Sequence, residues 1–332
     1  MVTLQGIQGE YELSDRVGKG ASLTYRAIDK RAQTAARTDP VVFIKFAERR
    51  TSRSNWDTQD QSSIDQAGSA DYCGTSSRPR DTCMLARENF AHSKVSHPQI
   101  IGATDRELSP STPRFLVFPF VRGRDLYQII KKRGPLSARE SFWLVEDVCD
   151  GLDAMHARGL VHRDIKPGNI VVDSEQARVA DLGLCYHSDI ADWDPPNSKI
   201  GTPFYMSPEQ VRAQPLSPAT DVYGLGATLY ESMTGVLPFT AENSVALMYK
   251  ILDEKPEQPH ITPAIDNVII KSLSKKQKDR FQSAGEFKEA FREAVADKRT
   301  YPVSTPKAIS MWSQICSKLH RKPASPSPET VE

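Results

Sequence analysis

The chain of 332 residues has few cysteines and no excess of charge, and both absences exclude classes of protein. The five cysteines are an odd number and show neither Cys-x-x-Cys pairs nor the Cys and His spacing of a zinc site. The 43 basic and 42 acidic residues give a net charge of +1, which gives no sign of a nucleic-acid-binding surface or of a strongly acidic partner. The composition therefore indicates a reduced, cytoplasmic protein without a nucleic-acid partner.

Long apolar runs are also missing from the chain. The N-terminus has no apolar core of a secretory signal, and runs such as residues 115 to 121 are far shorter than the ~20 residues that span a bilayer. We therefore expect no transmembrane span. The hydrophobic content of 39% is nevertheless ample for a substantial core.

The first part of the chain has the pattern of a small β-sheet. Residues 11 to 47 combine short apolar strands with a glycine turn and end in the run Val41-Val42-Phe43-Ile44 before Lys45. Residues 49 to 81 are polar and have no periodicity, which indicates a long flexible insertion. This insertion is either an exposed loop without function or a docking or self-phosphorylated segment.

A helix is expected over residues 82 to 95, because the apolar residues there recur at helical spacing. Glu88 lies on this apolar face, where a lone carboxylate is costly unless it meets a cation. The alternation of Val41, Phe43 and Lys45 sends Lys45 toward the inside of the sheet. The two side chains therefore predict each other as an ion pair, whereas a solvated Glu88 would leave Lys45 unexplained.

The second half of the chain has a largely helical pattern. The sequence Ser137-Ala138-Arg139-Glu140 has the form of a capping box and begins a helix that Gly159 ends. Further helices are expected over residues 221 to 233, 241 to 253, 262 to 273 and 283 to 297. The chain then becomes a proline-containing tail, in which residues 309 to 319 make one apolar helical face that docks on the domain or on a lipid surface.

One short segment, His162-Arg163-Asp164-Ile165-Lys166-Pro167-Gly168-Asn169, combines a carboxylate, an ammonium and an amide. Phosphoryl transfer uses this set, since an acid orients a hydroxyl, a cation lies near the moving phosphate and an amide oxygen binds a metal ion. The alternative is a polar turn between two strands. The segment resembles the catalytic loop of protein kinases, and Lys166, two residues after Asp164, resembles the serine/threonine branch.

This resemblance implies a two-lobed α+β fold. A small N-terminal lobe would hold an antiparallel β-sheet and one key helix, and a larger C-terminal lobe would be mainly helical. The kinase domain would cover residues 11 to 298, divided into lobes of about 11 to 121 and about 122 to 298. The insertion at 49 to 81 would lie in the small lobe, and residues 299 to 332 would form the tail.

Two further motifs resemble the phosphate-binding parts of a kinase. Gly18-Lys19-Gly20-Ala21-Ser22 resembles the glycine-rich loop, although it is one residue shorter and has Ser22 near the place of the third glycine. Lys45 resembles the lysine that holds the α- and β-phosphates of ATP, with Glu88 as its ion-pair partner. The resemblance therefore implies ATP as the nucleotide.

The adenine pocket follows from the same resemblance. Pro119 would offer its carbonyl to adenine and Val121 its N–H, while Asp125 is either a ribose contact or a solvated loop aspartate. Phe43 stands where most relatives have a small alanine, and its ring adds volume above the base.

The metal and the acid also have counterparts. Asp181-Leu182-Gly183 resembles the metal-binding motif of kinases, so Asp181 would coordinate Mg²⁺ and Asn169 a second ion, with Mn²⁺ as an alternative metal. Asp164 would orient the substrate hydroxyl and take its proton, and Lys166 would stabilise the transferred phosphoryl group.

The segment Gly201-Thr202-Pro203-Phe204-Tyr205-Met206-Ser207-Pro208-Glu209 resembles the end of a serine/threonine kinase activation segment, with Ser207 where alanine is usual. Such a segment docks a peptide and so implies a protein substrate. Thr202 resembles the threonine that contacts the catalytic acid and lysine. Glu209 and Arg280 resemble the buried ion pair that anchors the segment.

Structural roles are implied for His162, Arg163 and Asp221. Asp221 matches the helix aspartate that holds the catalytic loop, and a simple helix cap is the alternative. Arg163 suggests that a phosphate on the activation segment settles against it, with Ser198 as the best-placed acceptor and Thr202 and Ser188 as weaker ones. Alternatively, a carboxylate satisfies Arg163 without any phosphate. The acids of the activation segment that could pair with Arg163 in this way are Asp189, Asp192 and Asp194.

By these motifs the chain is identified as a serine/threonine protein kinase, similar to the eukaryote-like kinases of bacteria. It would transfer the γ-phosphate of ATP to protein substrates and to itself in signal transduction, with a cognate protein phosphatase as a further partner. One alternative is a pseudokinase that serves as a scaffold, which the presence of every chemical group opposes. The other is a small-molecule phosphotransferase, which the peptide-docking segment opposes.

Overall fold

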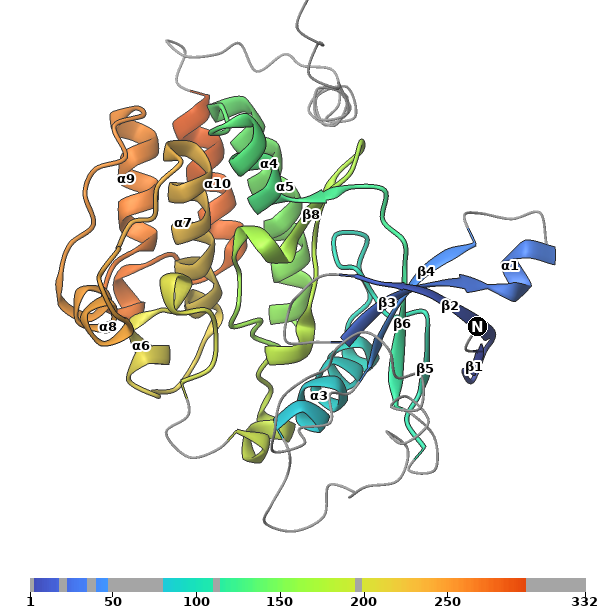
Figure 1. Cartoon of the computed structure of the whole chain (residues 1–332). Helices are drawn as coiled ribbons and strands as arrows, with labels where there is room; N and C mark the ends of the chain where they lie inside the picture. The colour runs from blue at the N-terminus through green and yellow to red at the C-terminus, as the bar shows by residue number, and fades with distance from the viewer. Residues whose placement is uncertain are drawn as a thin grey trace, which may run out of the picture.

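Two lobes of different composition make up the described part of the chain, one rich in strands and the other helical (Figure 1). The computed structural model describes residues 3–17, 23–34, 40–46, 80–109, 114–194 and 199–296. The α+β architecture expected from the motifs is present. The glycine-rich segment 18–22, residues 49–79 of the expected insertion, Ser198 and the tail lie outside the described residues.

The small lobe is built on a six-stranded antiparallel sheet with the strand order β1-β2-β3-β4-β6-β5. Its strands are β1 (Thr3–Gln5), β2 (Glu10–Arg16), β3 (Leu23–Asp29), β4 (Val41–Phe46), β5 (Asp105–Glu107) and β6 (Phe115–Pro119). The helices of this lobe are α1 (Lys30–Thr34) and α3 (Arg80–Lys94). The sheet therefore begins at Thr3, earlier than the expected start at residue 11.

The two faces of β4 separate the core from the functional side of the sheet. Val42, Ile44 and Phe46 join the hydrophobic cluster of the small lobe. Because successive side chains of a strand point to opposite faces, Phe43 and Lys45 face the other way. Helix α3 supplies the partner of Lys45, so the alternation along this strand predicted the arrangement correctly.

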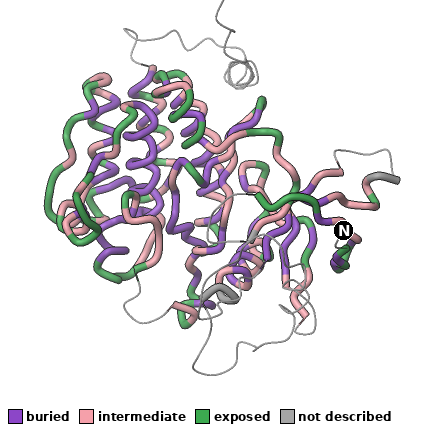
Figure 2. The backbone as a smooth tube through the Cα atoms, viewed as in Figure 1, coloured by how far each residue is buried: buried purple, intermediate pink, exposed green. Residues whose placement is uncertain are grey.

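The large lobe is mainly helical, and α7 (Pro218–Thr234) is buried along almost all of its length. Its helices are α4 (Leu126–Arg133), α5 (Ala138–His156), α6 (Pro208–Val211), α7 (Pro218–Thr234), α8 (Ser244–Asp253), α9 (Pro263–Ser272) and α10 (Ala284–Val295). Figure 2 shows α7 as an almost continuous buried segment, consistent with its run of buried residues. A Cβ on Gly226 would lie 1.9 Å from Oγ of Ser272, so α7 and α9 approach as closely as glycine alone permits.

Local signals placed most of the helix ends correctly. Both hydrogen bonds of the capping box are formed between Ser137 and Glu140, so α5 begins as predicted. Gly159, with φ of 72°, closes its end, where Leu160 N donates to Met155 O at 3.1 Å. Helix α7, however, begins three residues before the predicted Asp221, because Ser217 is its N-cap. The interpretation of Asp221 as a helix cap is therefore wrong.

The chain crosses between the lobes after β6 and then forms a second, three-stranded sheet (Figure 1). This sheet consists of β7 (Arg124–Asp125), β8 (Ile170–Val172) and β9 (Ala177–Val179). Residues 162–169 lie between α5 and β8, and Asp181 follows β9, so the sheet brings both segments to the junction of the lobes. Within the described ranges, no helix has both the length and the apolar character needed to cross a membrane.

Candidate active site

The carboxylate of Asp164 is the centre of the site. It is buried and accepts hydrogen bonds from Lys166 Nζ at 2.6 Å, from Asn169 Nδ2 at 2.9 Å and from the backbone N–H of Thr202 at 2.8 Å. Lys166 Nζ also contacts Thr202 Oγ1 at 2.5 Å. The expected contacts of Thr202 with the acid and the lysine are thus present, although Asp164 and Thr202 lie 38 positions apart.

The backbone of this loop is held by Asp221, which extends from α7. Its carboxylate accepts from the N–H groups of His162 and Arg163 at 2.8 Å each, and His156 Nε2 lies 2.8 Å from the same carboxylate. Burial alone would raise the pKa of Asp221, but the hydrogen bond and charge of His156 hold that pKa below its ordinary value. Arg163 has a φ of 68°, an unfavourable conformation that these hydrogen bonds stabilise. The structural link expected between Asp221 and the loop is present.

Lys45 joins the sheet to both α3 and the segment after β9. Its Nζ lies 2.7 Å from Glu88 Oε2 and 2.8 Å from Asp181 Oδ1. Burial by itself would lower the pKa of Lys45, but the two carboxylates outweigh burial and raise it above its ordinary value. Lys45 therefore stays charged.

Asp181 and Asn169 present oxygens of the kind that magnesium prefers. Asn169 uses its amide nitrogen on Asp164, and Lys45 and Gly183 use Oδ1 of Asp181, so one side-chain oxygen of each residue accepts no hydrogen bond from the described residues. No cluster of three or more His, Cys, Asp or Glu side chains suited to a metal occurs in the described ranges. Two protein ligands nevertheless fit Mg²⁺, which is usually bound through one or two side chains together with substrate phosphates.

The end of the segment that follows Asp181 is anchored by a buried ion pair. Arg280 donates to both carboxylate oxygens of Glu209, at 2.7 and 2.8 Å, and Thr220 Oγ1 donates to Glu209 at 2.9 Å. The pairing predicted for Glu209 and Arg280 is therefore present. Ser207, which replaces the usual alanine, forms a capping box with Gln210 at the start of α6.

The residues expected around adenine lie at the junction of the lobes. Pro119 ends β6, and Val121 follows it in the connecting segment. The ring of Phe43 packs against Phe120, with centroids 5.2 Å apart. Asp125 is the N-cap of α4 and accepts from Gln128 N at 2.8 Å, a role that neither of its two predicted alternatives included.

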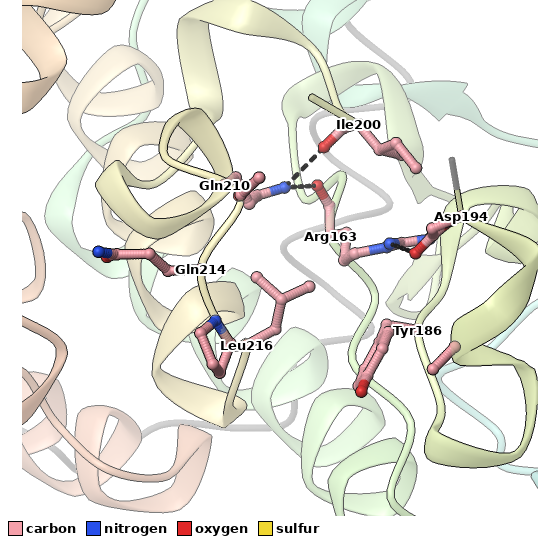
Figure 3. A pocket seen from close by; sticks show the side chains of 10 residues that line it. Arg163, Tyr186, Asp194, Ile200, Gln210, Gln214 and Leu216 are labelled. Atoms are coloured by element: carbon pink, nitrogen blue, oxygen red, sulfur yellow. Dashed lines mark hydrogen bonds and ion pairs between the residues drawn. The ribbon is translucent and has the colours of Figure 1, made fainter. Parts of the chain in front are cut away.

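Three residues of the site have no counterpart in the sequence predictions. Gln210 Nε2 donates to the carbonyls of Arg163 and Ile200 at 2.7 and 3.0 Å, which ties the loop to the segment (Figure 3). His156 supports Asp221, and Arg87 pairs with Asp194 at 2.7 Å. No local pattern indicates the contacts of Arg87 with Asp194, His156 with Asp221 or Gln210 with Arg163, because these partners lie between 47 and 107 residues apart. The capping-box spacing of Ser207 and Gln210 is the one local signal at these positions.

The sequence profile of the protein kinase domain matches residues 75–296. The chain is 34% identical to serine/threonine-protein kinase pkn3 of Myxococcus xanthus over 267 residues, which cover 76% of this chain and 48% of pkn3. It is 34% identical to serine/threonine-protein kinase PknB of Mycolicibacterium smegmatis over 215 residues, and 32% identical to PknB of Mycobacterium leprae over 212 residues. Each of these two matches covers 61% of this chain and 34% of the relative, so the chain spans about half or less of the curated relatives that it matches.

Proposed function

Because the chain belongs to the protein kinase family, of bacterial serine/threonine type, we propose that it transfers the γ-phosphate of ATP to serine or threonine hydroxyl groups of proteins. The observation that carries the proposal is the arrangement around Asp164, whose carboxylate is held by Lys166, Asn169 and Thr202. The proposed domain covers residues 11 to 298, with the lobe boundary near residue 121. Residues 299 to 332 form the proposed tail.

Each group has a separate task in the proposed reaction. Lys45, directed by Glu88, binds the α- and β-phosphates, and Asp164 orients the substrate hydroxyl and accepts its proton. The hydroxyl oxygen forms a bond to the γ-phosphorus as the bond to the leaving ADP oxygen breaks. Lys166 stabilises the charge of the phosphoryl group during this transfer. Mg²⁺ or Mn²⁺, held by Asp181 and Asn169, would neutralise phosphate charge when bound.

The contact between Lys166 and Thr202 supports a serine or threonine acceptor. It joins the catalytic loop to the segment that in protein kinases receives the substrate peptide, and Glu209 and Arg280 fix the other end of that segment. The proposed function includes autophosphorylation, a role in signal transduction and a cognate protein phosphatase as partner. Buried thiols at Cys149 and Cys185, neither of them in a disulfide, support a cytoplasmic location.

A transfer assay with γ-labelled ATP, Mg²⁺ and a serine- and threonine-containing protein tests the proposal. The wild-type chain should label the protein and itself on serine or threonine, as phosphoamino acid analysis would show. Lys45→Met and Asp164→Ala should each reduce the rate by about 1,000-fold, because each removes a group whose interaction strengthens in the transition state.

One control and two contradicting outcomes complete this assay. The two variants must show the circular dichroism of the wild type, so that lost activity is not lost folding. Equal labelling by all three proteins would refute the proposed catalytic site, and no labelling by the wild type would favour a pseudokinase.

A further inference from the structure

A single carboxylate, Asp194, lies between two buried arginines near the middle of the segment that runs from Asp181 to Glu209. Asp194 Oδ1 lies 2.7 Å from Arg87 Nη2, and Oδ2 lies 2.5 Å from Arg163 Nη1. Both guanidinium side chains are only 4% exposed, while Asp194 is 17% exposed. Figure 3 shows Asp194 pointing directly at Arg163. Both residues line a cavity of about 260 Å³.

The remaining partners of the two arginines are neutral. Arg87 donates to Cys185 O at 2.9 Å, and Arg163 donates to the carbonyls of Leu184 and Cys185. Among the described residues, Asp194 is the acid that forms an ion pair with either arginine. Two buried positive charges without a counter-ion would repel each other, so the carboxylate is needed to keep them together.

Each arginine of this cluster is the direct neighbour in sequence of a residue of the proposed active site. Arg87 immediately precedes Glu88 on α3, and Arg163 immediately precedes Asp164 in the catalytic loop. Asp194 therefore connects the helix that directs Lys45 to the loop that carries the acid. A shift of Arg163 would move Asp164, and a shift of Arg87 would move Glu88 and with it Lys45. Displacements of about 1 Å at such groups can cost about 100-fold in rate.

The neighbouring acids do not share this position. Asp189 pairs with Lys94 Nζ at 3.2 Å on the surface, and Asp192 is exposed. Of the three acids that the sequence offered for Arg163, the structure thus selects Asp194. Asp192 has the same side chain only two residues away, which makes it a matched control.

We propose that Asp194 is a positioning residue of the phosphotransfer site, which holds α3 against the catalytic loop in the place that a phosphorylated side chain of this segment would otherwise fill. This inference rests on the proposed kinase function. It means that the site is assembled without phosphorylation of the segment, so the phosphate expected on Ser198 is not required for activity.

Three variants test the proposal in the labelled-ATP assay. Asp194→Asn keeps the size of the side chain but removes its charge, and should reduce kcat by roughly 10- to 100-fold. Asp194→Glu restores the charge and should recover most of the activity, whereas Asp192→Asn should match the wild type. Wild-type protein treated with a protein phosphatase, and the Ser198→Ala variant, should both retain full activity.

A chemical rescue separates positioning from a general effect on folding. Asp194→Gly leaves room for a small anion between the arginines, and added sodium formate should restore part of its kcat, while sodium chloride at equal ionic strength should not. Recovery with formate while the circular dichroism stays unchanged would show that the loss lies in the site and not in the fold. Failure of both formate and Asp194→Glu to restore activity would overturn the proposal.

Hydrogen–deuterium exchange gives a readout that does not depend on activity. Asp194→Asn should speed exchange in α3 and in residues 184–194 but not in α9, and Asp192→Asn should leave all three unchanged. If the wild-type chain transfers no phosphate, the proposed function fails while this measurement still decides whether Asp194 holds α3. Full activity of Asp194→Asn, or activity lost after phosphatase treatment, would overturn the proposal.

Discussion

Two arginine–carboxylate clusters hold the segment from Asp181 to Glu209, one through Asp194 near its middle and one through Glu209 at its end, and they differ in how completely charge is balanced. At the end of the segment, Glu209 and Arg280 form a one-to-one pair with exposures of 2% and 0%. In the Asp194 cluster, this one carboxylate faces two arginines, Arg87 and Arg163, and is 17% exposed. A buried pair with equal and opposite charges fixes the structure around it. Two arginines that share one partly exposed carboxylate instead depend on that carboxylate to stay together.

The surroundings of the two clusters reinforce this difference. Glu209 receives a further hydrogen bond from Thr220, and Arg280 donates to three carbonyl groups and packs 4.9 Å from the ring centroid of Tyr223. Arg163 and Asp194 line a cavity instead. Water in that cavity would solvate Arg163 if the carboxylate were lost. We therefore expect the end cluster to govern stability and the Asp194 cluster to govern activity.

The largest expected effect is on stability, at the end cluster. Glu209→Ala strands a fully buried Arg280, which should lower the free energy of unfolding by about 3–5 kcal/mol in urea denaturation. Asp194→Ala should cost clearly less, because Arg163 can be hydrated from the cavity and both arginines still donate to the carbonyl of Cys185. Glu289→Ala is the surface control, since Glu289 and Arg292 form an exposed pair at 2.9 Å worth about 0.5 kcal/mol or less. Equal losses at Glu209 and Asp194 would remove the distinction between the clusters.

A smaller effect is expected in acid, on helix α3, which also carries Arg87 of the Asp194 cluster. His92 lies on α3, packs 5.6 Å from the ring centroid of Phe118 and has no hydrogen-bond partner for either ring nitrogen among the described residues. Burial, together with the charge of Lys45, lowers the pKa of His92 from 6.5 to about 4. As the pH falls through this range, the unfolded chain takes up a proton that the folded chain does not. The stability contributed by the neutral ring is complete above pH 6.5 and is lost toward pH 4.

Urea denaturation at several pH values measures this effect. Between pH 6.5 and pH 4 the free energy of unfolding of the wild type should fall by on the order of 2 kcal/mol. This value is smaller than the full pKa shift would give, because the ring is partly exposed. His92→Leu should remove this part of the pH dependence. A variant that kept the wild-type slope would show that another group is responsible.

The smallest effect concerns the cap beside the end cluster. Ser207 Oγ accepts from Gln210 N, and Gln210 in turn holds the carbonyl of Arg163. Ser207→Ala, which introduces the alanine usual in the family, should lower stability by about 1 kcal/mol through loss of the helix cap. Thermal denaturation measures this change, with Ser137→Ala at the cap of α5 as a matched control. A gain in stability would mean that the serine serves no structural purpose.

Much of the site could be predicted because its residues carry local signals. The alternation along β4 and the helical stripe around Glu88 together predicted the ion pair with Lys45, which the structure contains. The catalytic loop and the segment ending at Glu209 are contiguous motifs, so their resemblance to kinases was visible in the sequence. Most helix ends were predicted to within two residues, but α7 begins three residues before the predicted Asp221 and α8 three residues after the predicted residue 241.

The sequence by itself determined which chemical groups are present and which face of each strand or helix they occupy, because side-chain periodicity is a local property of the backbone. Only the tertiary structure decided which of three neighbouring aspartates would meet Arg163, and that Arg87 would join them from a helix more than 100 positions away. Such a contact depends on how separate elements pack. The desolvation of two arginines makes its energy large, and no local pattern records it.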